Sequence, residues 1–174
     1  MREYSTKLIT WYLIVRVLVI SLFLGGAIVY RLRGLAPATH PTLIHLYILF
    51  GVAFSQALVS LLVVGRVRRL RRFIQAQIAC DLLTTIFLIY LTGGVHSHFS
   101  FLFILIILSS GLFLGRRDIL IVASAAVILY CSLVDLQFYG YLPVIHGVDL
   151  VREIAWNEAF YKVFLHCFGF LLVG

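Results

Sequence analysis

The residues of this chain that could do chemistry are ionisable side chains embedded in long apolar stretches. A charged group inside a bilayer is costly, so each one marks a candidate functional site. Arg16 and Asp81 each lie eight residues after the start of an apolar stretch, which places both about 12 Å along their helices. We predict an intramembrane ion pair between them, facing the bundle interior. The alternative is that Arg16 extends to the aqueous surface while Asp81 bonds Thr84, Thr85 or a neutralising proton.

A second group of titratable residues is predicted near the outer side of the membrane. Three of them recur every four residues and so share one helix face. The members are His45, His96, His98, Asp135, Glu158, Lys162 and His166. Such a cluster could receive a ligand, a quinone headgroup, a proton or a polar residue of a partner helix. The alternative is that Asp135 pairs with Lys162 and the others form hydrogen bonds near the interface.

The run from Thr92 to His98 separates two apolar stretches with the residues Thr-Gly-Gly-Val-His-Ser-His. Backbone within lipid must be helical, so two spans joined by so short a break form a tight hairpin. We call this break the elbow and predict that it senses a ligand or signal. The elbow residues chosen for that role are Gly93, Gly94, His96, His98 and Phe99.

The sequence offers no catalytic apparatus. It has no P-loop, nucleophile elbow, HExxH motif or carboxylate pair at a shared depth, so we predict no catalytic residue in this chain. The two elbow histidines lack a nearby cysteine or carboxylate, so no metal site is predicted. Cys80, Cys131 and Cys167 fall within apolar stretches and are interpreted as small packing residues rather than a disulfide or metal set.

Composition identifies an integral membrane protein. Of the 174 residues, 63% are hydrophobic and 12% are charged, and a span needs about 20 apolar residues, which allows about six spans. We predict an all-α, polytopic bundle of six transmembrane helices with short loops. The predicted spans are 8–30, 42–64, 73–91, 98–114, 119–139 and 158–174.

The basic residues set the predicted orientation. Nine Lys and Arg lie in the N-terminus and in the 65–72 and 115–118 linkers, against three on the opposite side. Because basic loops stay in the cytoplasm, both chain ends should be cytoplasmic and the elbow should face outward. The same rule explains the net charge of +7 without nucleic acid. The last span is barely long enough and has no basic tail, so we expect a cytoplasmic continuation beyond residue 174.

The elbow and the helices after it resemble a known family. The run YLTGGVHSHFSFLFILIILSSGLFLGRRDILIVASAAVILY, with the arginine-rich turn before it and Leu136–Gly140 after it, resembles the membrane input domain of PilS-type sensor histidine kinases. The resemblance implies a bacterial inner-membrane location, a homodimer and a two-component system. It also implies a separate cytoplasmic kinase region that uses ATP and Mg²⁺ and phosphorylates a response regulator. A pilin transmembrane helix is the implied signal.

The elbow also resembles the outer loop of RegB-type redox-sensing kinases, whose GGxxNPF pattern is associated with ubiquinone. Gly93, Gly94 and Phe99 match that pattern, whereas Ser97 and His98 stand in place of Asn and Pro. This resemblance implies quinone as a ligand and a redox sensor as the function. A different alternative, based on the outer polar cluster, is a small transporter or substrate-binding membrane module.

Overall fold

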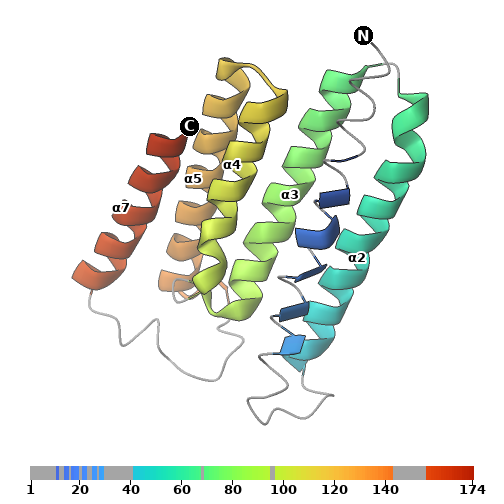
Figure 1. Ribbon diagram of the computed structural model, residues 1–174. Helices are drawn as coiled ribbons and strands as arrows, with labels where there is room; N and C mark the ends of the chain where they lie inside the picture. The colour runs from blue at the N-terminus through green and yellow to red at the C-terminus, as the bar shows by residue number, and fades with distance from the viewer. Residues whose placement is uncertain are drawn as a thin grey trace. The chain divides into compact units, whose positions relative to one another are not determined.

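The computed structural model describes residues 41–67, 69–94, 97–142 and 156–174, together with positions 11, 14, 15, 17–19, 21, 22, 25, 26, 28 and 29. These residues form helices, turns and short connections, with no strand among them (Figure 1). The prediction of an all-α protein is therefore confirmed. The chain divides into two units, Met1–Leu70 and Arg71–Gly174, which we describe separately.

The first unit contains α2, which covers Pro41–Val63 and continues into the short 3-10 helix η1 at Val64–Arg66. The described residues between 11 and 29 are helical, in the range of the first predicted span. Helix α2 has one buried face, and the apolar side chains on its other faces are exposed. The buried residues of this helix recur at helical spacing and are Leu46, Ala53, Ala57 and Ser60.

The described residues of the second unit form four longer helices. They are α3 (Leu70–Thr92), α4 (Leu102–Phe113), α5 (Arg116–Phe138) and α7 (Trp156–Val173), and the 3-10 helix η3 (His98–Phe101) precedes α4. The last three helices, α4, α5 and α7, pack against one another and lie side by side (Figure 1). Helix α3 runs antiparallel to α4, to which the elbow joins it, as expected for a hairpin.

Two helix starts differ from the predicted spans for local reasons. The span predicted at 98–114 opens as 3-10 helix, because Ser97 caps η3 and accepts a bond from the Phe99 amide. The span predicted at 119–139 begins three residues earlier, at Arg116. There the Gly115 carbonyl accepts bonds from the amides of Asp118 and Ile119, so the first turn of α5 includes the acid.

Aromatic rings fill the contact between α4, α5 and α7. Phe103, Tyr130 and Phe170 are all at most 1% exposed. The Phe103 and Phe170 ring centroids are 5.3 Å apart, and those of Tyr130 and Phe170 are 6.0 Å apart, both edge to face. Such pairs add about 0.5–1.5 kcal/mol each beyond their buried area. They fix how α7 sits on α4 and α5.

The outer surfaces of the described helices suit a bilayer. Three helical segments are long and apolar enough to cross one, namely Ile44–Arg66, Leu70–Thr92 and Arg116–Phe138, and His98–Phe113 and Val163–Val173 are shorter apolar helices. Large apolar side chains such as Leu112, Ile121 and Leu172 are more than 60% exposed. In water, such a surface would drive aggregation, whereas in lipid it is the contact surface.

Candidate functional site

The elbow turns on two glycines with positive φ. Gly93 has φ 125° and Gly94 has φ 60°, a backbone region that side chains with a Cβ disfavour. The turn closes when the Ser97 amide donates to the Gly94 carbonyl at 2.9 Å. The two adjacent glycines are therefore required by the backbone path itself.

A chain of hydroxyl hydrogen bonds holds the elbow to the end of α3. The Thr92 hydroxyl donates to the Leu88 carbonyl at 2.6 Å, which uses its only hydrogen. The Ser97 hydroxyl, 2.6 Å from Thr92 Oγ1, is then the donor in that pair. Ser97 Oγ in turn accepts from the Phe99 amide at 3.2 Å. The hydroxyls of Thr92 and Ser97 are thus both bonded within the chain.

The 3-10 helix η3, which follows the elbow, contacts the last described helix through a side-chain hydrogen bond. Ser100, which is 4% exposed, places its Oγ 2.8 Å from Nε2 of His166 on α7. The His166 ring lies 5.2 Å from the Tyr130 ring of α5 and 6.1 Å from the Phe170 ring. His166 therefore joins η3, α5 and α7 at one point, and we call Ser100, Tyr130 and His166 the relay cluster.

The elbow also contacts the outer end of α5. A Cβ placed on Gly94 would overlap Oε1 of Gln137 and would lie 2.6 Å from its Cδ. Gln137 is 5% exposed and sits on the buried face of α5. A side chain at position 94 is therefore disfavoured by its φ, and it also requires the amide of Gln137 to move.

Two buried polar atoms in this region have no hydrogen-bond partner in the described structure. They are the Tyr130 hydroxyl and Gln137 Oε1, which lie seven residues apart and so on the same face of α5. Buried polar groups are normally bonded, and each exception calls for an explanation. Here the two atoms mark the part of the bundle where α5 meets the elbow and α7.

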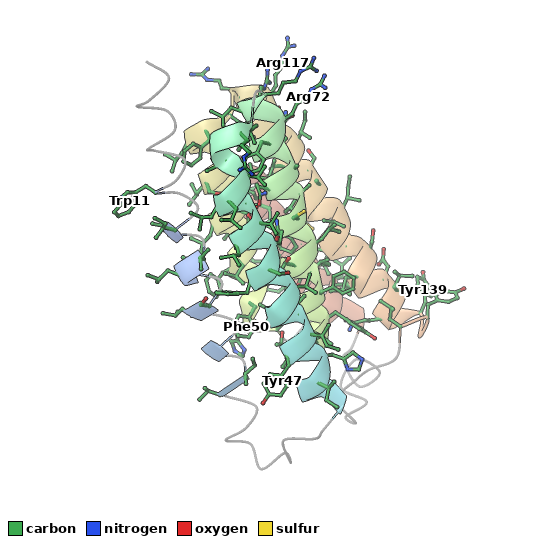
Figure 2. All side chains as sticks on the ribbon, turned by 90° about the vertical axis from the view of Figure 1, so that its right-hand side faces the viewer. Trp11, Tyr47, Phe50, Arg72, Arg117 and Tyr139 are labelled. Carbon is green, nitrogen blue, oxygen red and sulfur yellow. The ribbon has the colours of Figure 1, made fainter. Side chains whose placement is uncertain are left out.

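The opposite end of this unit carries an ion pair. Arg71 on α3 donates to Asp118 Oδ2 on α5 at 2.6 Å, and Gln75 donates to Oδ1 at 2.9 Å. The Asp118 side chain is 8% exposed and that of Arg71 is 69% exposed. Arg72 and Arg117 project from the same end of the unit (Figure 2). The contact ties α3 to α5 at the arginine-rich end, while the elbow ties them at the other end.

The described residues place the predicted sensing side chains in different surroundings. Gly93 and Gly94 form the elbow turn, and Phe99 is half-buried beside it. His98 and Asp135 are exposed, as is His45 in the first unit, whereas His166 is half-buried in the relay cluster. His96 and the side chains of Glu158 and Lys162 lie outside the described residues, so the Asp135–Lys162 alternative stays a prediction.

The predicted intramembrane acid, Asp81, is buried at 9% exposure on α3. Gln77 and Thr85, one turn before and after it, are also buried, so a polar stripe runs along the buried face of α3. The Thr84 hydroxyl donates to the Cys80 carbonyl at 2.9 Å. Arg16 lies outside the described residues, so its pairing with Asp81 stays a prediction.

Gly111 and Gly115 have the GxxxG spacing that lets two membrane helices approach closely when both glycines share one helix face. Here they do not share a face. Helix α4 ends at Phe113, Leu114 is extended (φ −117°, ψ 165°), and Gly115 precedes the first residue of α5.

In the described part of the chain, no three His, Cys, Asp or Glu side chains gather to hold a metal ion.

Several residues of these sites escaped the sequence analysis. Asp118 was missed because it follows two arginines in a short linker. A single acid in a basic turn could have indicated an ion pair with a nearby arginine. Ser100, Tyr130 and Gln137 carry no pattern of their own, since hydroxyls and amides are common near helix ends. Only the packing of helices far apart in sequence brings them together.

Comparison with known proteins gives one match. The family model described as the PilS-like transmembrane domain, of the six-transmembrane type, matches residues 1–170. No curated protein and no solved structure matches the chain.

Proposed function

Because this chain belongs to the PilS-like transmembrane domain family, we propose that it is the signal-input domain of a two-component sensor histidine kinase. It is a multi-pass membrane protein with a helical membrane domain. In the proposed role, it sits in the bacterial inner membrane and passes a membrane or outer signal to a cytoplasmic kinase region. That region would use ATP and Mg²⁺ to phosphorylate itself and then a response regulator.

The family match over residues 1–170 carries this proposal, and the Ser100–His166 hydrogen bond of 2.8 Å offers a route for the signal through the bundle. Ser100 belongs to η3, which directly follows the elbow, and His166 belongs to α7, the last helix described. A change in the elbow can therefore reach the last described helix through η3 and Ser100, in addition to the packing of α7 on α4 and α5. In a sensor, the last helix is the one that would lead to the kinase region.

The contacts at the two ends of α3 support a bundle with two arrangements. The elbow is pressed against Gln137 of α5 at one end, and Arg71 bonds Asp118 of α5 at the other. A signal that moved the elbow would change its contact with Gln137, while the Arg71–Asp118 ion pair would stay in place and act as a pivot. Input then shifts the equilibrium between two packings of the same helices, which is how a ligand or partner acts on a switch.

The energies suit a switch spread over several contacts. Moving a population from 1:10 to 10:1 requires about 2.8 kcal/mol, since each factor of ten is about 1.4 kcal/mol. Interhelical hydrogen bonds in membranes average about 0.6 kcal/mol and reach about 1.7 kcal/mol. Ser100–His166 alone is too weak, but the Tyr130 and Phe170 ring contacts add about 0.5–1.5 kcal/mol each. We therefore propose that the relay cluster acts as one unit with Phe170.

The test uses the full-length gene product in membrane vesicles and measures autophosphorylation from labelled ATP. Ser100→Ala and His166→Gln should each alter the basal rate in the same direction, and the double variant should add little to either. Ser109→Ala is the matched control, because within the described part of the chain the Ser109 hydroxyl bonds the Ile106 carbonyl of its own helix, at 2.8 Å, and no other helix. This control should keep the parental rate.

Two results would overturn the proposal. One is a gene that ends at residue 174 or continues without a phosphoacceptor-histidine and ATP-binding region. The other is a kinase whose rate is the same in the parent, in Ser100→Ala and in His166→Gln. The partners we propose are a second copy of this chain, a response regulator and a pilin transmembrane helix. Crosslinking in the same vesicles identifies which of them contact the membrane domain.

A further inference from the structure

Two cysteines from different helices meet inside the second unit. The Sγ atoms of Cys131 on α5 and Cys167 on α7 are 3.1 Å apart, although 36 residues separate them in sequence. All three cysteines of the chain are free thiols, and all are half-buried. The third, Cys80, lies on α3. By sequence, all three cysteines are interpreted alike, as packing residues, whereas the fold brings Cys131 and Cys167 together.

The neighbours of the two cysteines hold them in register. Tyr130 and His166 come directly before Cys131 and Cys167, and their rings are in contact at 5.2 Å. Tyr130 and Phe170 are almost fully buried, so α5 and α7 cannot rotate about their axes without breaking ring contacts. Packing on both helices thus keeps the two cysteine positions facing each other.

The surroundings of the thiol pair are those of a bilayer interior. Cys131 is seven residues before the end of α5 at Phe138, which is about 10 Å from that end of the helix. On α7, Phe164, Leu165 and Phe168 are more than half exposed around Cys167. Lipid chains cover such a surface, so an oxidant that reaches the half-buried thiols must itself dissolve in lipid.

We propose that Cys131 and Cys167 form a reversible intramembrane disulfide, oxidised by lipid-soluble organic hydroperoxides. One thiol sulfur attacks the peroxide, so that an S–O bond forms, the O–O bond breaks and an alcohol leaves. The second thiol then attacks the resulting sulfenic acid, so that the S–S bond forms and water leaves. Two thiols and one hydroperoxide thus give one disulfide, one alcohol and one water.

The required movement is small. A disulfide has an S–S distance of about 2.05 Å, so the two sulfurs must approach by about 1 Å from their present 3.1 Å. Rotation of the two side chains supplies a shift of this size. The resulting bond would tie α5 to α7 covalently beside the relay cluster. The site does not depend on the signalling role proposed above.

The test uses the full chain in liposomes of saturated phospholipid, treated with cumene hydroperoxide, then unfolded and alkylated with a maleimide. Intact mass spectrometry counts the alkylated thiols. The count should fall from three to one, with Cys80 as the residue still alkylated, and a reductant should restore all three. Cys80→Ser should still lose two alkylated thiols, whereas Cys131→Ser and Cys167→Ser should form no intrachain disulfide.

Three outcomes would overturn the proposal. The first is a chain with all three thiols still alkylated after the hydroperoxide. The second is a peptide map in which Cys80 is a partner in the disulfide. The third is a link between two chains, seen as a dimer on a non-reducing gel that disappears on reduction. Circular dichroism of each serine variant verifies that the helices are intact when the thiols are counted.

Discussion

Replacing Gly94 by alanine tests the description of the elbow most directly. The substitution places a Cβ at φ 60°, where a non-glycine residue costs about 1–2 kcal/mol. The Cβ also overlaps the buried amide of Gln137, and overpacking costs about 1–3 kcal/mol. The sum is about 2–5 kcal/mol. At about 2–4 °C for each kcal/mol, the melting temperature should fall by about 4–20 °C.

Gly140 provides the matched control for Gly94→Ala. It has φ 76° and no atom within 4 Å of an added Cβ, so Gly140→Ala incurs the backbone cost without the overlap. Its expected loss is therefore about 1–2 kcal/mol. Adding Gln137→Ala to Gly94→Ala should recover the overlap part and leave a loss close to that of the control.

The assay is thermal unfolding of the purified chain in detergent, followed by helical circular dichroism. The reasoning is refuted if Gly94→Ala melts no lower than Gly140→Ala, because Gln137 would then move aside freely. It is also refuted if Gln137→Ala fails to restore any stability to Gly94→Ala. In that case, the contact between the elbow and α5 would not limit what position 94 accepts.

Three further substitutions address the ion pairs and the topology. Asp118→Asn should lower the melting temperature, and because the Arg71 side chain is 69% exposed, salt should shrink the difference from the parent; an equal loss at low and high salt would contradict an ionic contribution. Asp81→Ala should destabilise the bundle or bias its signalling, and adding Arg16→Ala should partly restore it; a double variant as impaired as Asp81→Ala would dismiss the pair. His98→Cys, with the three native cysteines changed to serine, should react with an impermeant maleimide only from the outer side; reaction only from the cytoplasmic side would reverse the orientation.

The sequence by itself determined the class of protein and the position of the elbow. Several apolar stretches of about 20 residues exclude a water-soluble fold, because their side chains must be covered by lipid or detergent. The pair Gly93 and Gly94 between two such stretches indicated a tight break in the helices, and in the structure both glycines adopt positive φ there. These conclusions need only local information, since hydropathy and backbone freedom are properties of neighbouring residues.

The tertiary structure alone decided which side chains meet. Ser100 contacts His166 across 66 residues, Arg71 contacts Asp118 across 47, and Cys131 contacts Cys167 across 36. Each contact depends on the rotation and register of the elements that it joins, which for α5 and α7 are held by the buried rings of Tyr130 and Phe170. Because apolar side chains cover most of the surface of the described helices, hydropathy by itself leaves that rotation undetermined. In a membrane helix, the inward face is chosen by packing and hydrogen bonding rather than by contrast with water.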